Sequence, residues 1–411
     1  MASSAKETRA VLEALRHDPE VVVSVARGVL FRTCGLFKRW EKGWYSINHL
    51  GALVCSDGDD ARDAKPVLDR IVAASVVQSE QSKCGVLMHA FQVKAANGDT
   101  RMLYCEDELC RDHWVLTVNE AVRRAGGGRP MQLADHYAID YSSKLGSGLF
   151  AVVLRATDRK SGQSVAIKAI KPERFREHQS LILSEVSAWS AVGTHPRIVH
   201  LLGSFQSASR MYFACELCPG GGLVSSLSRN ATYCEKDAEH IMRQVLEGLA
   251  HIHSRGVVHC DLKPENIIAM SKAKKTDIKI ADFGLSAYMG RPMHVGGTPE
   301  FAAPELLRDP EYFMGAGVGA EVDMWSAGVL LYYLLSGTTP FFASSFDKIV
   351  AKVKDGTWTF KGPAWVEISA SAKDLVKSLL CPVPDRRPSA SQALAKPWVV
   401  REGSAPTKVG G

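Results

Sequence analysis

The stretch Val258-His259-Cys260-Asp261-Leu262-Lys263-Pro264-Glu265-Asn266 decides how this chain is interpreted. It brings a carboxylate, a lysine and an amide into one short segment, and Asp282-Phe283-Gly284 follows soon after it. Carboxylate and amide oxygens suit Mg²⁺, and lysine is a compact cation that suits phosphate. Phosphoryl transfer needs charge neutralisation and in-line positioning more than covalent help from the protein. What this stretch means depends on the motifs that accompany it along the chain.

Two further motifs lie upstream of this stretch. The segment Leu145-Gly146-Ser147-Gly148-Leu149-Phe150-Ala151-Val152-Val153 has two glycines, which let a backbone approach phosphates and donate N–H groups. The segment Val165-Ala166-Ile167-Lys168 has the pattern of an apolar strand that ends in a lysine. Taken alone, the first is a weak indication of phosphate binding and the second is usually a surface lysine. Their weight comes from their order along the chain.

The segment 180–192 predicts a helix that could carry a carboxylate partner for Lys168. Glu185 has apolar residues one turn away on each side, so it would face inward with them. Glu173 and Glu177 are less well placed. A solvated helix charge is the alternative interpretation of Glu185.

From Tyr137 to about Val400, these motifs and their order resemble a eukaryotic protein kinase. The resemblance implies a bilobal α+β fold, ATP and Mg²⁺ as cofactors, and transfer of the γ-phosphate to protein hydroxyls. It assigns catalytic roles to Asp261, Lys263, Lys168 and Glu185, and Mg²⁺ binding to Asn266 and Asp282. It assigns nucleotide binding to Leu145, Gly146, Ser147, Gly148, Leu149, Phe150, Ala151, Val152, Val153, Ala166, Lys168, Glu216 and Cys218.

The segment 211–221 resembles the hinge between the two kinase lobes, in which Glu216 to Cys218 would offer backbone groups to adenine. Cys215 and Cys218 also form a CxxC pattern. A metal or redox interpretation would need a second ligand pair or a thioredoxin-like context, and the sequence offers neither.

The Lys263-Pro264-Glu265-Asn266 form of the loop implies serine/threonine specificity. The segments 297–305, 335–341 and 393–399 resemble the calmodulin-dependent kinase group. Within it, His259-Cys260-Asp261 is similar to protein kinase D, and 297–301 is similar to death-associated and myosin light chain kinases. In this group Glu305 would pair with Arg387.

Two departures from the family pattern concern activation. Cys260 stands where many kinases have an Arg that clamps a phosphorylated activation loop, and His294 stands where the phosphate would be carried. We therefore expect activity without activation-loop phosphorylation. Residues 401–411 contain no basic amphipathic helix, so we expect no calmodulin-binding segment in this chain.

Before residue 126 the pattern is mostly β, with one helix expected over 106–124. Asn97-Gly98 predicts a two-residue hairpin turn. The residues 28–32, 37–47 and 89–93, together with Trp114, resemble a pleckstrin-homology domain, a β-sandwich or barrel closed by a C-terminal helix. The predicted organisation is a lead-in (1–20), this domain (21–125), a Gly-rich linker (126–136), the kinase domain (137–400) and a tail (401–411).

Basic residues of the N-terminal domain suggest a lipid or protein contact. Arg32, Lys38, Arg39 and Lys42 cluster in the loop expected between the first two strands, a loop that can bind inositol phosphates in the family, and Arg and Lys suit phosphate. Gly43 departs from the lipid-binding pattern, and nearby acidic residues oppose it. Phosphoinositide binding, a protein-contacting or autoinhibitory role, and a plain solvated basic edge all stay open.

Composition limits the remaining function classes. The 411 residues are 46% hydrophobic and 23% charged, with a net charge of +6, which does not argue for nucleic acid. No apolar run reaches a membrane span, and Met324–Leu335 predicts a buried helix. Scattered cysteines favour a reducing cytoplasmic setting. An active kinase is the leading hypothesis; the alternatives are a pseudokinase scaffold and a membrane- or partner-recruited adaptor. The expected location is the cytoplasm, with peripheral membrane association as a second option.

Overall fold

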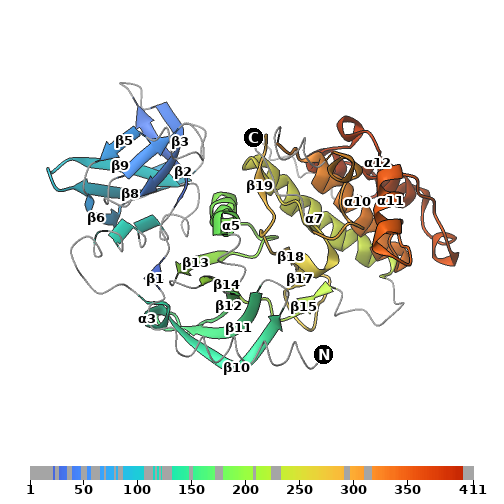
Figure 1. The fold of residues 1–411 in the computed structure, drawn as a ribbon, viewed down its shortest axis with the longest axis horizontal. Coiled ribbons are helices and arrows are strands. Elements are labelled where there is room, and N and C mark those ends of the chain that lie inside the picture. Colours follow the sequence, from blue (N-terminus) through green and yellow to red (C-terminus); the bar gives the residue numbers. More distant parts are fainter. Residues whose placement is uncertain are drawn as a thin grey trace, which may run out of the picture. The chain divides into compact units, whose positions relative to one another are not determined.

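A computed structural model describes residues 22–23, 27–34, 39–47, 53–56, 65–68, 71–77, 80–81, 87–105, 114–115, 118–119, 122, 132–147, 151–171, 179–206, 210–223, 233–290, 297–309 and 317–400 (Figure 1). The chain divides into two compact units. The first comprises residues 1–194 and 200–217, and the second comprises residues 195–199 and 218–411.

The N-terminal part of the first unit is an antiparallel sheet of eight strands, in the order β5-β4-β3-β2-β9-β8-β6 with β7 paired to β8 (Figure 1). Its strands are β2 (Arg27–Cys34), β3 (Arg39–Ile47), β4 (Leu53–Ser56), β5 (Lys65–Leu68), β6 (Ile71–Val76), β7 (Glu80–Gln81), β8 (Leu87–Ala95) and β9 (Thr100–Cys105). The hairpin predicted around Asn97-Gly98 is present between β8 and β9. Its loop has three residues rather than two, since Ala95 and Asp99 still pair and Gly98 has φ 93°.

The core of this sheet is closed by helical residues. Trp114 is 2% exposed and stacks on Phe91 of β8, with ring centroids 6.4 Å apart. Asn119 accepts from the Ala74 N–H and donates to the Ala74 carbonyl, both at 2.8 Å, so the helical residues are tied to β6. The predicted order of strands followed by a packed Trp114 helix is thus observed in the described residues. The pleckstrin-homology assignment itself stays a prediction.

The strands of this domain are longer at the basic residues than expected. Arg32 lies in β2, and Arg39 and Lys42 lie in β3. The backbone of Arg32 pairs in register with that of Glu41. Lys38 lies outside the described residues. The predicted basic loop is therefore largely a pair of strands.

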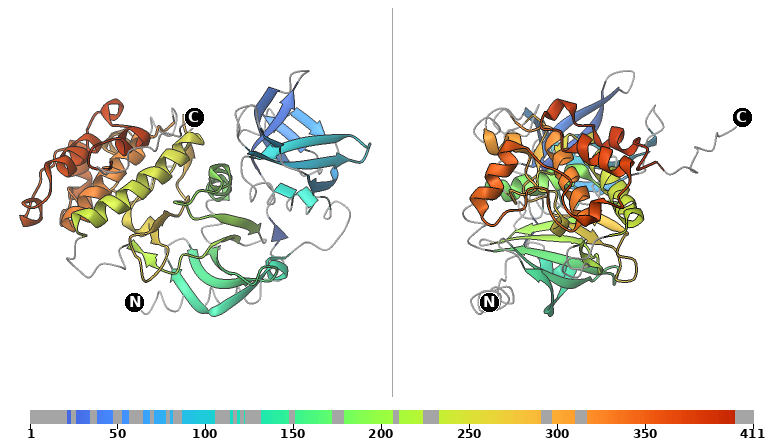
Figure 2. Two further views of the ribbon diagram at one scale, coloured as in Figure 1. Left: turned by 180° about the vertical axis from the view of Figure 1, so that it is seen from behind. Right: turned by 90° about the vertical axis from the view of Figure 1, so that its right-hand side faces the viewer.

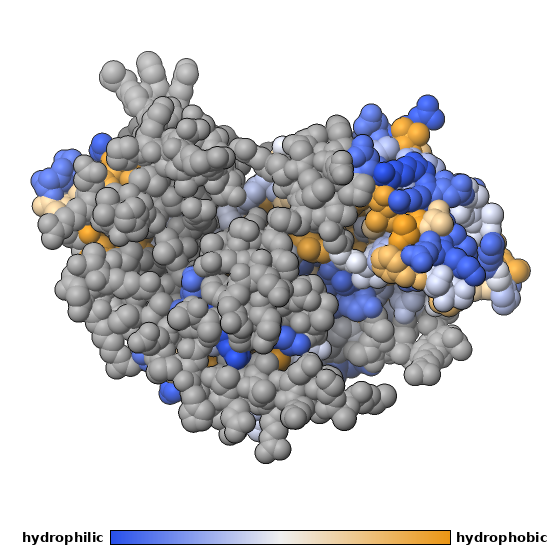
Figure 3. All heavy atoms as spheres, viewed as in Figure 1, coloured by the Kyte–Doolittle hydropathy of each residue, from blue (hydrophilic) through white to orange (hydrophobic). Residues whose placement is uncertain are grey.

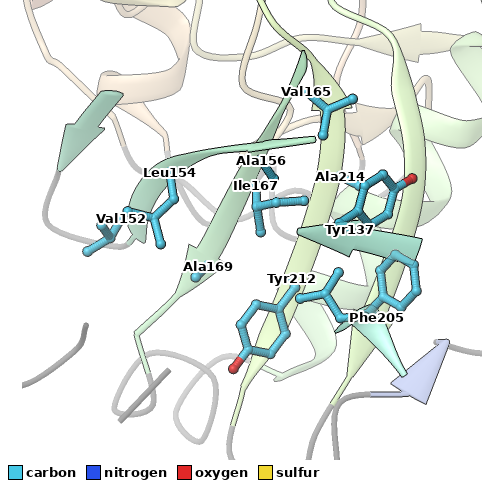
Figure 4. Close-up of a cluster of buried hydrophobic side chains, with 11 residues drawn as sticks. Tyr137, Val152, Leu154, Ala156, Val165, Ile167, Ala169, Phe205, Tyr212 and Ala214 are labelled. Atoms are coloured by element: carbon cyan, nitrogen blue, oxygen red, sulfur yellow. The ribbon is translucent and has the colours of Figure 1, made fainter. Parts of the chain in front are cut away.

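A second sheet in the first unit has six antiparallel strands in the order β1-β13-β14-β12-β11-β10. They are β1 (Val22–Val23), β10 (Tyr137–Ser147), β11 (Ala151–Asp158), β12 (Ser164–Ile170), β13 (Leu201–Gln206) and β14 (Met211–Glu216). Strand alternation directs Val152, Leu154 and Ala156 of β11 to one face. There they join a buried cluster with Tyr137, Val165, Ile167, Ala169, Phe205, Tyr212 and Ala214 (Figure 4).

Two helices accompany this sheet. The predicted helix over 180–192 is confirmed as α5 (Gln179–Val192), and its Val186 and Trp189 are buried. The short helix α3 (Leu133–His136) occupies the end of the expected Gly-rich linker, where Leu133 is 3% exposed in the same core. The last residues before the sheet are therefore packed structure.

The second unit is mostly helical (Figures 1 and 2). Its helices are α7 (Glu235–Ser254), α8 (Pro304–Arg308), α10 (Glu321–Ser336), α11 (Phe346–Asp355), α12 (Ala370–Leu379) and α13 (Ala390–Leu394), with 3₁₀ turns η2 (Pro264–Asn266), η3 (Pro363–Trp365) and η4 (Pro384–Arg386). Its short strands are β15 (Gly221–Gly222), β17 (Ile267–Ala269) and β18 (Ile278–Ile280) in one sheet, and β16 (Val257–Val258) with β19 (Ala287–Tyr288) in another.

Helix α10 is the centre of this unit, as the buried-helix prediction for Met324–Leu335 requires. Most of its residues are buried, and it packs against α7 and α12. A Cβ at Gly328 would lie 2.9 Å from side-chain atoms of Leu379 and Leu380, so only glycine allows α12 to approach this closely.

The surface is mixed in polarity on the face that Figure 3 shows, where apolar side chains of the second unit lie among hydrophilic ones. The most exposed large apolar side chains near α11 are Phe342 and Phe346, at 67% and 65%. None of the described helices is long and apolar enough to cross a membrane.

The predicted pair of Glu305 and Arg387 is present, with Arg387 buried and Glu305 partly buried. Arg387 donates to both carboxylate oxygens at 2.6 and 2.8 Å, to the Glu321 carbonyl at 2.9 Å and to the Cys381 carbonyl at 2.8 Å. Its guanidinium also lies 5.0 Å from the Trp325 ring centroid. The ion pair therefore joins α8, α10 and the segment after α12.

Replacing this arginine tests its contribution to stability. We expect Arg387→Ala to lower the free energy of unfolding by about 3–5 kcal/mol, because Glu305 would keep its partly buried charge without a partner. Arg386→Ala is the matched control, because Arg386 is exposed. Urea unfolding measures both. Equal losses in the two variants would contradict the central position of this pair.

Candidate active site

Within the first unit, the sheet and helix α5 bring Lys168 and Glu185 together. The Lys168 Nζ lies 2.7 Å from Glu185 Oε1, and Glu185 is 4% exposed. The Nζ also lies 5.6 Å from the Phe213 ring centroid, and Phe213 packs against Trp189 of α5. The predicted pairing is thus confirmed as a contact, whereas Glu173 and Glu177 lie outside the described residues.

The strand face that carries Lys168 is opposite to the apolar core. Val153 pairs in register with Lys168, and Ala166 pairs with Cys215, whose thiol lies 3.6 Å from the Ala166 carbonyl. Val153 is half-buried. These small and apolar residues would suit a flat ring beside the lysine.

Val152 differs from its prediction as a nucleotide-binding residue. Its side chain is fully buried in the cluster of Figure 4, because neighbouring residues of a strand face opposite sides. Only its backbone is left for a contact on the other face. Leu145, 41% exposed, and the neighbouring Gly146 and Ser147 lie at the end of β10, whereas Gly148, Leu149 and Phe150 lie outside the described residues.

Within the second unit, the segment 258–266 forms a compact polar loop. Lys263 Nζ lies 2.7 Å from Asp261 Oδ2. Asn266 Nδ2 donates to the Asp261 carbonyl at 2.8 Å and to Asp261 Oδ2 at 3.0 Å. The 3₁₀ turn η2, which begins at Pro264, returns Asn266 to Asp261. The structure therefore brings together the three side chains that the sequence singles out here.

The backbone of this loop is bound by Asp323, a residue of α10. Asp323 is 0% exposed. Its carboxylate accepts from the His259 N–H, the Cys260 N–H and His253 Nε2, each at 2.8 Å. Burial alone would raise the pKa of Asp323, but the hydrogen bond and charge of His253 and the bonds of the loop hold it below its ordinary value. The carboxylate is thus held ionised where it fixes the loop backbone.

Among the residues that the structure describes, two that are not glycine have left-handed backbone conformations, Cys260 at φ 64° and Asp282 at φ 67°. Such conformations cost free energy and persist where surrounding structure fixes them. For Cys260, the fixing contact is the bond to Asp323. For Asp282, Oδ1 accepts from the Gly284 N–H at 3.3 Å, and Phe283 packs on His259 with ring centroids 5.2 Å apart.

The hinge prediction concerns residues at the end of β14. Glu216 exchanges bonds with His200: its N–H donates to the His200 carbonyl at 2.9 Å, and its Oε2 accepts from the His200 N–H at 3.3 Å. The Cys218 thiol lies 3.7 Å from the Met270 sulfur. Neither contact indicates a metal site, and the described residues hold no group of three or more His, Cys, Asp or Glu placed to bind a metal ion.

Comparison with protein families identifies the domain that contains the Lys168–Glu185 pair and the loop around Asp261. Residues 139–399 match the model of the protein kinase domain, and the range includes the Lys168–Glu185 pair and the loop around Asp261. The chain belongs to the protein kinase family.

Individual relatives of this kinase narrow the family. It is 38% identical over 258 residues to the calcium/calmodulin-dependent protein kinase type 1B of Rattus norvegicus, which covers 62% of this chain and 73% of the relative. It is 35% identical over 297 residues to calcium-dependent protein kinase 24 of Oryza sativa subsp. japonica, covering 69% and 56%. The kinase is therefore a serine/threonine protein kinase of the calcium/calmodulin-dependent group.

Among solved structures, the kinase is similar to a twitchin kinase fragment of Caenorhabditis elegans, an autoregulated protein kinase with immunoglobulin domains. The TM-score is 0.59 at 35% identity, and the match covers 67% of this chain and 60% of that one. This confirms the predicted bilobal kinase fold, with a sheet-rich and a helical lobe.

One functional position was not predicted from the sequence. Gly297 has φ 99°, and a Cβ there would lie 2.9 Å from Asp261 Oδ1. The sequence shows only a glycine before Thr298, and the approach to Asp261 depends on how the segment folds back. The glycine leaves room for the Asp261 carboxylate.

Adding a methyl group at this position tests that close approach. We expect Gly297→Ala and Gly256→Ala each to lose about 1–2 kcal/mol of stability, because both glycines are left-handed. A Cβ at Gly256 meets nothing within 4 Å. Only Gly297→Ala should also lower kcat, by up to about 10²-fold, because the Asp261 carboxylate must move. Equal kcat values for the two variants would contradict this role.

Proposed function

We propose that this kinase transfers the γ-phosphate of ATP to serine and threonine hydroxyls of proteins. The observation that carries the proposal is the Asp261–Lys263–Asn266 arrangement, with contacts of 2.7 to 3.0 Å. A carboxylate next to a lysine provides an acceptor for the hydroxyl proton and a cation for the phosphate in one place.

The side chains present fit Mg²⁺ held together with nucleotide. Mg²⁺ takes oxygen ligands, commonly one or two carboxylates together with phosphates. Asn266 uses its NH₂ group for both of its bonds to Asp261, so its amide oxygen is the end that would meet a cation. Asp282 would supply the carboxylate. Bound Mg²⁺ would neutralise phosphate charge during transfer.

Each residue then has one task on the nucleotide or the substrate. Lys168, oriented by Glu185, would hold the α- and β-phosphates. Asp261 would orient the substrate hydroxyl and accept its proton as the hydroxyl oxygen bonds to phosphorus and the bond to the β-phosphate oxygen breaks. Lys263 would stabilise the charge on the transferred group. The residues around Val153, Ala166 and Glu216 to Cys218 would bind adenine.

We also propose that activation does not need a phosphate on the activation segment. The Cys260 side chain bonds to the Val258 carbonyl at 3.6 Å, and burial and the Asp323 charge raise the pKa of its thiol. A neutral thiol cannot clamp a phosphate. Ser286 is 8% exposed and donates to the His259 carbonyl at 3.3 Å, so it is not presented for phosphorylation. His294 lies outside the described residues.

Substrates with a basic residue near the target would suit the acidic groups of this unit. Burial first, and then the charge of Glu265, raise the pKa of the Glu300 carboxyl. The same two causes raise the pKa of Tyr333. A cation near Glu265 and Glu300 would relieve the repulsion between these acids.

The N-terminal domain, pleckstrin-homology-like in our proposal, would regulate or target the enzyme.

Phosphate transfer from Mg·ATP to a generic protein substrate tests the proposed chemistry on the full chain. Asp282→Ala should abolish transfer, and Asp261→Asn should lower kcat by about 10²-fold or more with a similar KM for ATP. Asp374→Ala, which removes an exposed carboxylate of α12, should leave the rate unchanged. Product analysis should find phosphoserine and phosphothreonine. Undiminished transfer by Asp282→Ala, or phosphotyrosine as the product, would overturn the proposal.

A further inference from the structure

The six-stranded sheet that contains Lys168 has at one edge a strand, β1, that lies outside the kinase domain. Val22 pairs with Gln206 and Val23 pairs with Phe205, so β1 extends the sheet by antiparallel addition to β13. An unpaired sheet edge presents N–H and C=O groups that readily accept an extended segment. Residues at the very start of the predicted N-terminal domain thus cover the edge of the sheet at β13.

Residues that follow the N-terminal domain meet the same strand. His136, the last residue of α3, and Tyr137 both lie against Phe205, with ring centroids 5.8 Å away in each case. Arg159 fixes this helix, since its Nε donates to the Ala134 carbonyl and its N–H to the His136 carbonyl, both at 2.8 Å. The chain therefore enters and leaves the N-terminal domain next to one buried phenylalanine.

Phe205 is close to Lys168 across strand β14. It pairs with Tyr212, and the next residue on β14, Phe213, pairs with Lys168. The Phe213 ring lies near the Lys168 Nζ and packs on Trp189, one turn from Glu185 on α5. A continuous series of backbone and ring contacts thus joins the docked edge to the Lys168–Glu185 pair.

We propose that β13 is a regulatory docking edge, at which Val22–Val23 of the same chain stabilises the Lys168–Glu185 pair. Two residues contribute few main-chain hydrogen bonds, so this pairing is easily opened and closed. A ligand that displaces the N-terminal region would release the edge and weaken nucleotide binding. This inference rests on the proposed function, because it gives that nucleotide site its control.

Two double variants of the full chain separate main-chain pairing from side-chain effects. Val22→Pro/Val23→Pro removes both N–H donors, whereas Val22→Thr/Val23→Thr keeps them and stays β-branched. Hydrogen exchange followed by mass spectrometry reports on residues 201–206. Calorimetric titration gives the Kd for Mg·ATP without any need for catalysis.

In the proline variant we expect exchange over 201–206 to be about two- to tenfold faster and the Kd to rise by a similar factor, as the loss of one or two hydrogen bonds implies. The threonine variant should match the unmodified protein in both measurements. Unchanged exchange in the proline variant, or faster exchange in both variants, would overturn main-chain docking. Faster exchange with an unchanged Kd would overturn the coupling. A failure of the proposed phosphate transfer would appear separately, in the unmodified protein.

Discussion

The buried carboxylate of Asp323 is the constraint on which the catalytic loop depends. Three donors converge on it at 2.8 Å, two of them backbone N–H groups of consecutive residues. An ionised group without exposure is costly unless it is fully bonded, so these bonds are needed by the acid as much as by the loop. They hold Cys260 in its left-handed conformation, and Asp261 follows directly in the chain. The position of Asp261, to which we assign the proton-accepting role, is thus set by a fully buried residue of another element.

In both units, charged side chains are positioned by contacts with buried partners. In the second unit, α10 supplies Asp323 and also meets Arg387 through the Glu321 carbonyl. In the first unit, Lys168 is oriented by a nearly buried Glu185 and by the Phe213 ring. Charged side chains that would take many conformations in water are fixed by partners whose burial makes the pairing strongly favourable. The chemistry needs little more than this fixed arrangement.

The parts that could be predicted are those where chemistry restricts residue type locally. The loop around Asp261, the strand ending in Lys168 and the buried helix α10 follow from motif and pattern. The clearance between Gly297 and Asp261, the inward face of Val152 and the three-residue hairpin at Gly98 depend on backbone geometry that residue types do not specify. The pairing of Val22–Val23 with β13 joins segments about 180 residues apart, and nothing local marks either as the partner.

The most direct test of this account is amide exchange at His259 and Cys260, measured together with kcat, in Asp323→Asn. Asparagine keeps the shape but replaces one carboxylate oxygen by an NH₂ group, which cannot accept a backbone N–H. We predict faster exchange at one or both amides and a fall in kcat with a similar Kd for Mg·ATP. Unchanged exchange with unchanged kcat would show that the loop holds its geometry without the carboxylate, and would contradict the account.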